Sequence, residues 1–200
     1  MILIVYVISF IENLDISFFY FINHLRSPFL DKILPIFSLP NFLYLIYFLS
    51  TLLILFKIGF KRYLLFSLIL IIGFLSSDFI CSQFAKPFFK RKRPFLTRKN
   101  IYYYSRNNFQ FLKKPIKKQC VFSFPSGHAT LSGYTSSFLS FEFPKASPLW
   151  ITFALIVGWS RIYLGHHYPL DIIGGYILGL FCAIIFYKIY IYINKKLYEK

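Results

Sequence analysis

Three basic side chains from separate segments of the sequence could together bind a phosphate group. A phosphate monoester carries almost two negative charges at neutral pH, so a site for it needs fixed cations and amide donors. The sequence offers Lys86, Arg93 and Arg161. The planar guanidinium of an arginine can hold two phosphate oxygens at once, and the lysine adds a point charge. We therefore expect an anion site where the fold brings these segments together.

The segment 125–128, which has the sequence PSGH, adds backbone donors to this set. Pro125 suits the first position of a helix, and the N–H groups at a helix start have no partner within the helix. We expect the N–H groups of Ser126, Gly127 and His128 to donate to the anion, helped by the positive end of the helix dipole. A glycine at position 127 lets the phosphate approach the backbone closely.

Two histidines could divide the roles of nucleophile and proton donor. His167 and Asp171 are four residues apart, so on the first turn of a helix they share one face. Asp171 can accept the N–H of one ring nitrogen and leave the other nitrogen unprotonated for attack on phosphorus. His128 can then donate a proton to the departing oxygen, since the pKa of a histidine suits proton transfer near neutral pH.

In order and spacing, these residues resemble the signature of the type 2 phosphatidic acid phosphatase superfamily of membrane lipid phosphate phosphatases. The blocks that match are Lys86-x6-Arg93-Pro94, PSGH at 125–128, and Ser160-Arg161-x5-His167-x3-Asp171. The resemblance covers about residues 80–180. It implies that His167 forms a phosphohistidine, that His128 changes role while water hydrolyses it, and that the reaction needs no metal.

The sequence itself shows no metal-ligand pattern. His166 and His167 are adjacent and do not share a simple ligand geometry with Asp171. Cys81, Cys120 and Cys182, the cysteines of the chain, have no paired spacing either. We therefore expect an enzyme with neither metal nor cofactor, in which His166 serves packing.

The composition places these residues in a membrane. Of the 200 residues, 57% are hydrophobic and only 15% are charged, and the mean hydropathy is +0.58. A water-soluble globule is about a quarter charged and could not bury 27 Phe and 16 Tyr. The predicted fold class is an all-α integral membrane bundle of five or six helices. No repeat or linker divides residues 1–200, so we expect a single domain.

Five apolar stretches are long enough to cross, or nearly cross, a hydrocarbon core of about 30 Å. They are Ile36–Phe56, Tyr63–Phe84, Pro125–Phe141, Pro148–Tyr163 and Asp171–Ile193. Residues 1–22 are interrupted by polar side chains, and we expect an interfacial helix there, or else a tilted one. Tracing the spans brings the loop 86–124 and the turn 160–171 to the same end of the bundle.

The net charge of +16 is concentrated in the loop 86–124, which carries twelve lysines and arginines. Such a loop between apolar spans suits an anionic lipid surface or a phosphorylated substrate rather than a nucleic acid. Within it, the run 90–92 (KRK) is expected to contact headgroups. Asp78, near the end of the second span, is expected to position Lys86 or to cap its helix.

The predicted function is that of a membrane lipid phosphatase which hydrolyses a phosphate monoester or diphosphate. The basic loop favours undecaprenyl diphosphate or lipid A, followed by a glycerophospholipid phosphate. Two alternatives remain: a phosphotransferase between lipids, which would share the phosphohistidine step, and a non-catalytic transporter or scaffold.

The positive-inside rule places the basic loop in the cytoplasm, whereas the resemblance implies an inner-membrane protein whose site faces the periplasm or exterior. We expect the latter, since several of these cations serve the substrate.

Overall fold

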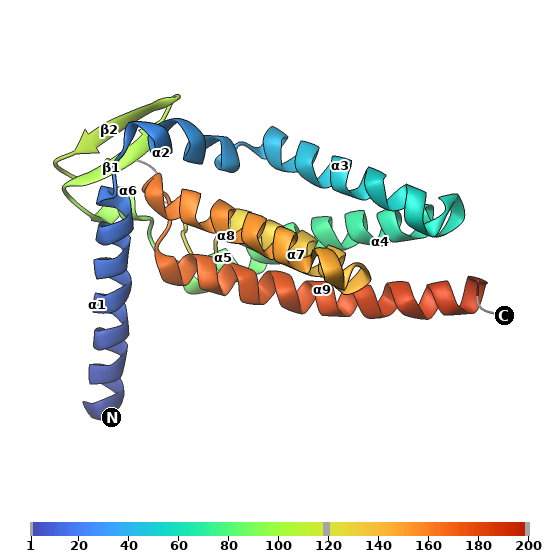
Figure 1. The fold of residues 1–200 in the computed structure, drawn as a ribbon. Coiled ribbons are helices and arrows are strands. Elements are labelled where there is room, and N and C mark those ends of the chain that lie inside the picture. The colour runs from blue at the N-terminus through green and yellow to red at the C-terminus, as the bar shows by residue number, and fades with distance from the viewer. Residues whose placement is uncertain (1, 118–120, 199–200) are drawn as a thin grey trace.

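Five helices of the described chain run side by side and form the bundle that carries the site (Figure 1). The computed structural model describes residues 2–117 and 121–198, so Lys118 and Cys120 lie outside the described residues. The bundle helices are α3 (Pro40–Ile58), α4 (Phe60–Phe79), α7 (Gly127–Glu142), α8 (Ser147–Tyr163) and α9 (Pro169–Tyr198). The smaller or peripheral elements are α1 (Ile2–His24), α2 (Pro28–Ile33), η1 (Leu34–Ser38), η2 (Ile80–Ala85), α5 (Lys86–Phe89), α6 (Pro94–Thr97), β1 (Ile101–Ser105), β2 (Asn108–Leu112) and η3 (Pro144–Ala146). The predicted all-α bundle is confirmed, with a small hairpin added to it.

Three helical stretches of the described chain are long and apolar enough to cross a membrane: Pro40–Ile58, Phe60–Phe89 and Pro169–Tyr198. The second is continuous because α4 passes into the π-helical segment η2 and then into α5. α7 and α8, with 16 and 17 residues, are close to the minimum length for a span. α3, the first of these three stretches, begins at Pro40 and not at Ile36 as predicted, since residues 34–38 form the 3-10 helix η1.

α7 and α9 approach each other backbone to backbone. A Cβ atom on Gly179 would lie 2.3 Å from the carbonyl oxygen of Thr130, and one on Gly175 would lie 2.7 Å from that of Ser126. Real Cβ atoms do not come so close to backbone atoms, so only glycine fits at these positions. The contact at these glycines fixes the start of α9 against the start of α7.

The basic stretch 86–124 is folded more tightly than an open loop. β1 and β2 pair antiparallel, with Ile101 opposite Leu112. Arg106 and Asn107, between the strands, both have positive φ angles of 51° and 63°, which is the geometry of a two-residue hairpin turn. From the sequence, a loop was predicted here and not a hairpin. The tyrosines and phenylalanines on both sides of the turn favour extended backbone, which explains why strands form.

α1 runs crosswise to the bundle helices, past the end that carries the hairpin and the start of α9 (Figure 1). Asn23, in its last turn, is fully buried. Its side-chain amide donates to the carbonyls of Tyr102 (2.8 Å) and Tyr163 (2.9 Å) and accepts the N–H of Tyr102. Towards the other end of α1, Tyr6 and Phe10 are 71% and 63% exposed. One end of this helix is therefore fixed to the bundle, and the other presents apolar surface.

Candidate active site

The segments that carry the motif residues meet where α8 ends and where α7 and α9 begin. The chain after α5 pairs with the chain before α7 through an antiparallel bridge between Lys92 and Phe122. Beside it, the N–H of Ser123 donates to the carbonyl of Arg91 at 2.7 Å. This pairing holds the end of the first motif block next to the start of the second, although about 30 residues separate them in the sequence.

Three cations of this site have no acidic partner among the residues that the structure describes. Arg161 is only 7% exposed, and its Nε makes no hydrogen bond. Nε of Arg93 donates to the backbone carbonyl of Phe122 at 3.2 Å. Lys86 Nζ lies 3.6 Å from the point that a Cβ atom on Gly127 would occupy. Within residues 2–117 and 121–198, no carboxylate forms an ion pair with these three side chains. Partly buried cations without a counter-ion are unfavourable by themselves, so this cluster is suited to bind an anionic ligand.

The backbone at the start of α7 supplies fewer donors than expected. α7 begins at Gly127 with Ser126 as its N-cap, so Pro125 lies before the helix and not at its first position. The N–H of Ser126 donates to the backbone carbonyl of Asp171 at 2.9 Å. The prediction that this N–H group is free to bind an anion is therefore wrong, because the close approach of α9 gives it a carbonyl partner. The N–H groups of Gly127 and His128 have no partner within the helix, and the buried Ser126 Oγ has no hydrogen-bond partner.

Replacing Gly127 by alanine is expected to lower activity strongly without unfolding the protein. The new methyl group would lie 3.6 Å from Lys86 Nζ, an ordinary contact that needs no movement of the fold. It would nevertheless occupy the space between the lysine and the helix start, where the sequence predicts that a phosphate oxygen binds. We expect kcat/KM for phosphate release to fall by about 10²-fold, with the unfolding temperature within about 2 °C of wild type. A loss of activity that tracks a loss of folded protein would contradict this explanation.

His167 is oriented through a serine that the motif does not contain. Its Nδ1 lies 3.3 Å from Ser123 Oγ and 3.5 Å from Asp171 Oδ2, and the Ser123 hydroxyl donates to that carboxylate oxygen. Because Ser123 gives its proton to Asp171, its oxygen accepts the Nδ1–H of His167, which leaves Nε2 with a free electron pair. α9 begins only at Pro169, so His167 precedes the helix instead of lying in its first turn.

The surroundings of His167 keep its ring neutral. The side chain is 1% exposed. Burial lowers the pKa of His167 well below its usual value, and the nearby cations Arg93 and Arg161 lower it further. A neutral imidazole with Nδ1 protonated is the form that can act as a nucleophile through Nε2.

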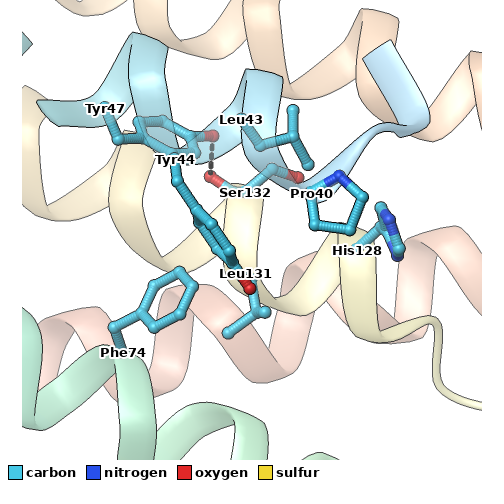
Figure 2. A pocket seen from close by; sticks show the side chains of 8 residues that line it. All are labelled: Pro40, Leu43, Tyr44, Tyr47, Phe74, His128, Leu131 and Ser132. Atoms are coloured by element: carbon cyan, nitrogen blue, oxygen red, sulfur yellow. Dashed lines mark hydrogen bonds between the residues drawn. The ribbon is translucent and has the colours of Figure 1, made fainter. Parts of the chain in front are cut away.

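His128 contacts the neighbouring 3-10 helix as well as the site. Its Nε2 donates to the carbonyl of Ser38, the last residue of η1, at 3.2 Å. Figure 2 shows the ring beside Pro40, at one end of a largely apolar cavity between α3, α4 and α7. The expected proton donor therefore lies at the junction of the cationic cluster and an apolar cavity.

The sequence-based expectations for Arg91 and Asp78 do not match the structure. Arg91 was expected to contact headgroups with the rest of the run 90–92, but its guanidinium donates to Asp171 Oδ1 at 2.8 Å and also forms an ion pair with Asp15. Burial works against the charged form, yet these two carboxylates raise the pKa of Arg91 above its usual value. Asp78 is exposed and forms no ion pair with Lys86 in the described chain.

Ser123 and Asp15 belong to the site although neither lies in a motif. Asp15 is one of several polar residues that interrupt the segment 1–22, and Ser123 lies between two phenylalanines at the end of the basic stretch, so neither local pattern indicated a place in the site. His166 packs as predicted, since its Nε2 donates to the Tyr104 carbonyl at 3.1 Å and its ring lies near Tyr103 and Phe95. The described residues contain no group of three or more His, Cys, Asp or Glu side chains that could hold a metal ion.

A family model for the PAP2 superfamily matches residues 61–195, which is more than half of the chain. This chain belongs to the PAP2 superfamily. The match includes the whole cationic cluster and both histidines of the PAP2 site, and it ends within α9. The matched range therefore contains the helices that carry the candidate site.

Several of the curated proteins similar to this PAP2 chain carry names of lipid phosphatases. Undecaprenyl-diphosphatase BcrC of Bacillus subtilis is 35% identical over 66 residues, which are 33% of this chain and only 34% of that protein. The lipid A 4'-phosphatase of Bacteroides thetaiotaomicron is 28% identical over 188 residues, which are 91% of this chain and 79% of that protein. The crystal structure of Aquifex aeolicus LpxE has a TM-score of 0.63 at 24% identity, covering 88% of this chain and 95% of that chain. This last likeness shows that the PAP2 chain has the same fold.

Proposed function

We propose that this PAP2 protein is a metal-independent lipid phosphate phosphatase. The observation that carries the proposal is the cluster of Lys86, Arg93 and Arg161, three cations without carboxylate partners, next to a neutral histidine with a free Nε2. Such a cluster binds an anion and stabilises the additional charge on the transferring phosphoryl group. The membrane-spanning bundle and the names of the similar proteins support a lipid as the carrier of that group.

The arrangement supports a reaction in two steps. In the first step, Nε2 of His167 forms a bond to phosphorus while the bond from phosphorus to the lipid oxygen breaks, and His128 gives that oxygen a proton. Protonated His128 can keep its Nε2–H on the Ser38 carbonyl and offer its Nδ1–H to the leaving group. In the second step, water attacks phosphorus, its proton passes to His128, and the bond between phosphorus and nitrogen breaks to release phosphate.

The pH dependence of this reaction follows from the depressed pKa of His167. Protonation of Nε2 would stop the attack, so on the acidic side activity is lost as the pH falls through the pKa of this ring. Because burial and the neighbouring cations lower that pKa, we expect the acidic limb of kcat/KM to lie well below the usual histidine value of about 6.5. The second ionisation of a phosphate monoester, near pH 6, overlaps this range. Histidine NMR is therefore the deciding measurement, and a His167 ring that is charged at about pH 6.5 would contradict the expectation.

The apolar tail of the lipid has a path along the bundle. From His128, one cavity of about 60 Å³ extends between Pro40 and Leu131 (Figure 2). A second cavity of about 280 Å³ shares Tyr44, Tyr47 and Phe74 with the first and continues between α3 and α4. A substrate whose phosphate occupies the cationic cluster could place its chain in this apolar groove, in contact with the surrounding bilayer. The groove supports an amphiphilic substrate over a soluble phosphate ester.

Two lipids are the preferred substrates, undecaprenyl diphosphate and lipid A. The local similarity to BcrC supports the first, and the end-to-end similarity to the lipid A 4'-phosphatase of Bacteroides thetaiotaomicron supports the second. Both headgroups are strongly anionic, as the basic stretch 86–124 favours. A glycerophospholipid phosphate ranks third.

Phosphate release by the purified protein in detergent tests the proposal. The panel holds undecaprenyl diphosphate, lipid A, phosphatidylglycerophosphate and phosphatidic acid, with EDTA present throughout. Release from one of these lipids that survives EDTA and disappears in His167→Ala is the expected result. A well-folded protein that releases phosphate from none of the four would overturn the proposal. Phosphate that appears on an added acceptor lipid instead of in water would identify a phosphotransferase.

We place the chain in the inner membrane, with the site facing the periplasm or exterior and α1 lying in the interface. The crosswise direction of α1 and its exposed Tyr6 and Phe10 support the interfacial position (Figure 1). Single cysteines at Lys99 and Lys113, in a cysteine-free background, should react with an impermeant maleimide in intact cells. A cysteine at Lys145, at the opposite end of the bundle, should react only after permeabilisation. The reverse pattern would put the site in the cytoplasm.

A further inference from the structure

Asp15 is a buried carboxylate in a helix whose other large side chains are mostly exposed and apolar. It lies in the middle of α1 and is 3% exposed. One of its oxygens pairs with Arg91, and Oδ1 accepts the N–H of Leu170 at 2.7 Å. Leu170 is the second residue of α9, so its N–H has no partner within its own helix. Asp15 thus caps from α1 the helix that carries Asp171.

Arg91 extends this contact to the site. While Nη2 pairs with Asp15, Nη1 donates to Asp171 Oδ1 at 2.8 Å. The guanidinium lies over the ring of Tyr168, 4.2 Å from its centroid. Because one rigid plane holds both carboxylates, a displacement of Asp15 changes the position of Asp171.

Asp171 in turn determines the orientation of the nucleophilic ring. Its Oδ2 accepts hydrogen bonds from the Ser123 hydroxyl and from the N–H of Tyr168, the latter at 2.8 Å. Ser123 Oγ lies 3.3 Å from Nδ1 of His167. The chain of contacts from Asp15 to this ring is therefore continuous and runs through buried or half-buried groups.

We propose that Asp15 is a positioning residue for His167, acting through Arg91 and the first turn of α9 on Asp171. The inference rests on the proposed function, since it gives α1 a part in phosphoryl transfer. Mere attachment of α1 needs no buried carboxylate, because Asn23 and the fully buried Phe19 already hold the helix. A buried ion pair adds little stability compared with apolar residues of the same size, so a role in orientation explains Asp15 better.

The test replaces Asp15 by asparagine, which keeps the size of the side chain and removes its charge. We expect kcat to fall about 10- to 100-fold, the usual effect of a group that orients a reacting residue. KM should stay within about threefold, since Asp15 does not contact the substrate. Arg91→Lys should have a similar effect, because one ammonium group cannot hold two carboxylates in the fixed geometry of a guanidinium. It also serves as the second variant if Asp15→Asn does not fold.

A double mutant separates positioning from simple stability. In the Asp171→Asn background, the additional Asp15→Asn change should lower kcat by less than about threefold, because its effect passes through Asp171. Independent damage to the fold would multiply with the first effect. Glu12→Gln is the matched control: Glu12 lies one turn earlier in α1 and lines a cavity with Arg91, but it is exposed and forms no ion pair in the described chain. It should leave kcat unchanged.

A second readout does not depend on turnover. In protein with ¹⁵N-labelled histidine, the wild type should show His167 protonated at Nδ1 only, and Asp15→Asn should show a mixture of tautomers. If the wild type releases no phosphate from any lipid, the proposed function fails while this spectrum still decides the role of Asp15. The inference is overturned if Asp15→Asn equals Glu12→Gln in kcat and leaves the His167 tautomer unchanged.

Discussion

Replacement of His167 by alanine is expected to lower kcat by a factor on the order of 10⁵ or more, because this ring supplies the attacking atom itself. The cationic cluster would remain, so KM should change far less than kcat. Phosphate release from the preferred lipid measures the loss. A brief reaction with ³²P-labelled lipid, stopped with alkali, should label the wild-type protein as an acid-labile phosphohistidine and leave His167→Ala unlabelled.

The neighbouring histidine provides the control for this experiment. His166 is also buried, but its Nε2 donates to the Tyr104 carbonyl and its ring packs against aromatic side chains. His166→Gln keeps an N–H donor and should retain most of the activity and all of the labelling. Alkali-stable label on His167→Ala would place the nucleophile elsewhere.

Asp171→Asn is expected to lower kcat by about 10³- to 10⁴-fold. Asp171 accepts from Ser123, Arg91 and the N–H of Tyr168, and an amide of the same size cannot accept all three bonds. If the amide nitrogen faces Ser123, the serine must accept instead of donate, and the preferred tautomer of His167 is lost. Single-turnover rates with saturating lipid measure the effect on the chemical step.

Asp31→Asn is the matched control for this carboxylate. Asp31 lies at the same end of the bundle, where it pairs with Arg26 at 2.7 Å and accepts from the Tyr163 hydroxyl, but it does not contact the histidines. Its replacement should affect stability more than kcat. The explanation for Asp171 is wrong if both variants lower kcat to the same extent per folded molecule.

Much of the site is predictable because its residues belong to short motifs with fixed spacing along the sequence. The order of Lys86, Arg93, PSGH and the final block already indicates phosphate chemistry, and the apolar stretches place these blocks at one end of a bundle. The bounds of the bundle helices were predicted to within about five residues for the same reason, since hydrophobicity over about 20 residues is a local property. Of the five predicted spans, three lie in described helical stretches that are long and apolar enough to cross a membrane. Spacing along the chain thus determines which residues can serve the reaction.

The remaining parts of the site depend on contacts between distant segments. Arg91 meets Asp15 across 76 residues and Asp171 across 80, and no local pattern encodes such pairs. Ser123 is a single polar residue whose partners lie at the start of another helix. The N–H of Ser126 was expected to be free, but glycines on α9 let a carbonyl reach it. Packing between helices determines these contacts, and one sequence alone does not report it.

The three cations without carboxylate partners also affect the folding equilibrium. They repel one another in the free protein, and Arg161 is almost fully buried, so this end of the bundle is less stable than an apolar one would be. Binding of phosphate or vanadate would offset that repulsion and raise the unfolding temperature. The gain is about 2.7 kcal/mol at an anion concentration 100 times the dissociation constant. A neutral substitute such as Arg161→Met would stabilise the fold and abolish turnover, so the residues that serve this reaction are kept at the expense of thermal stability.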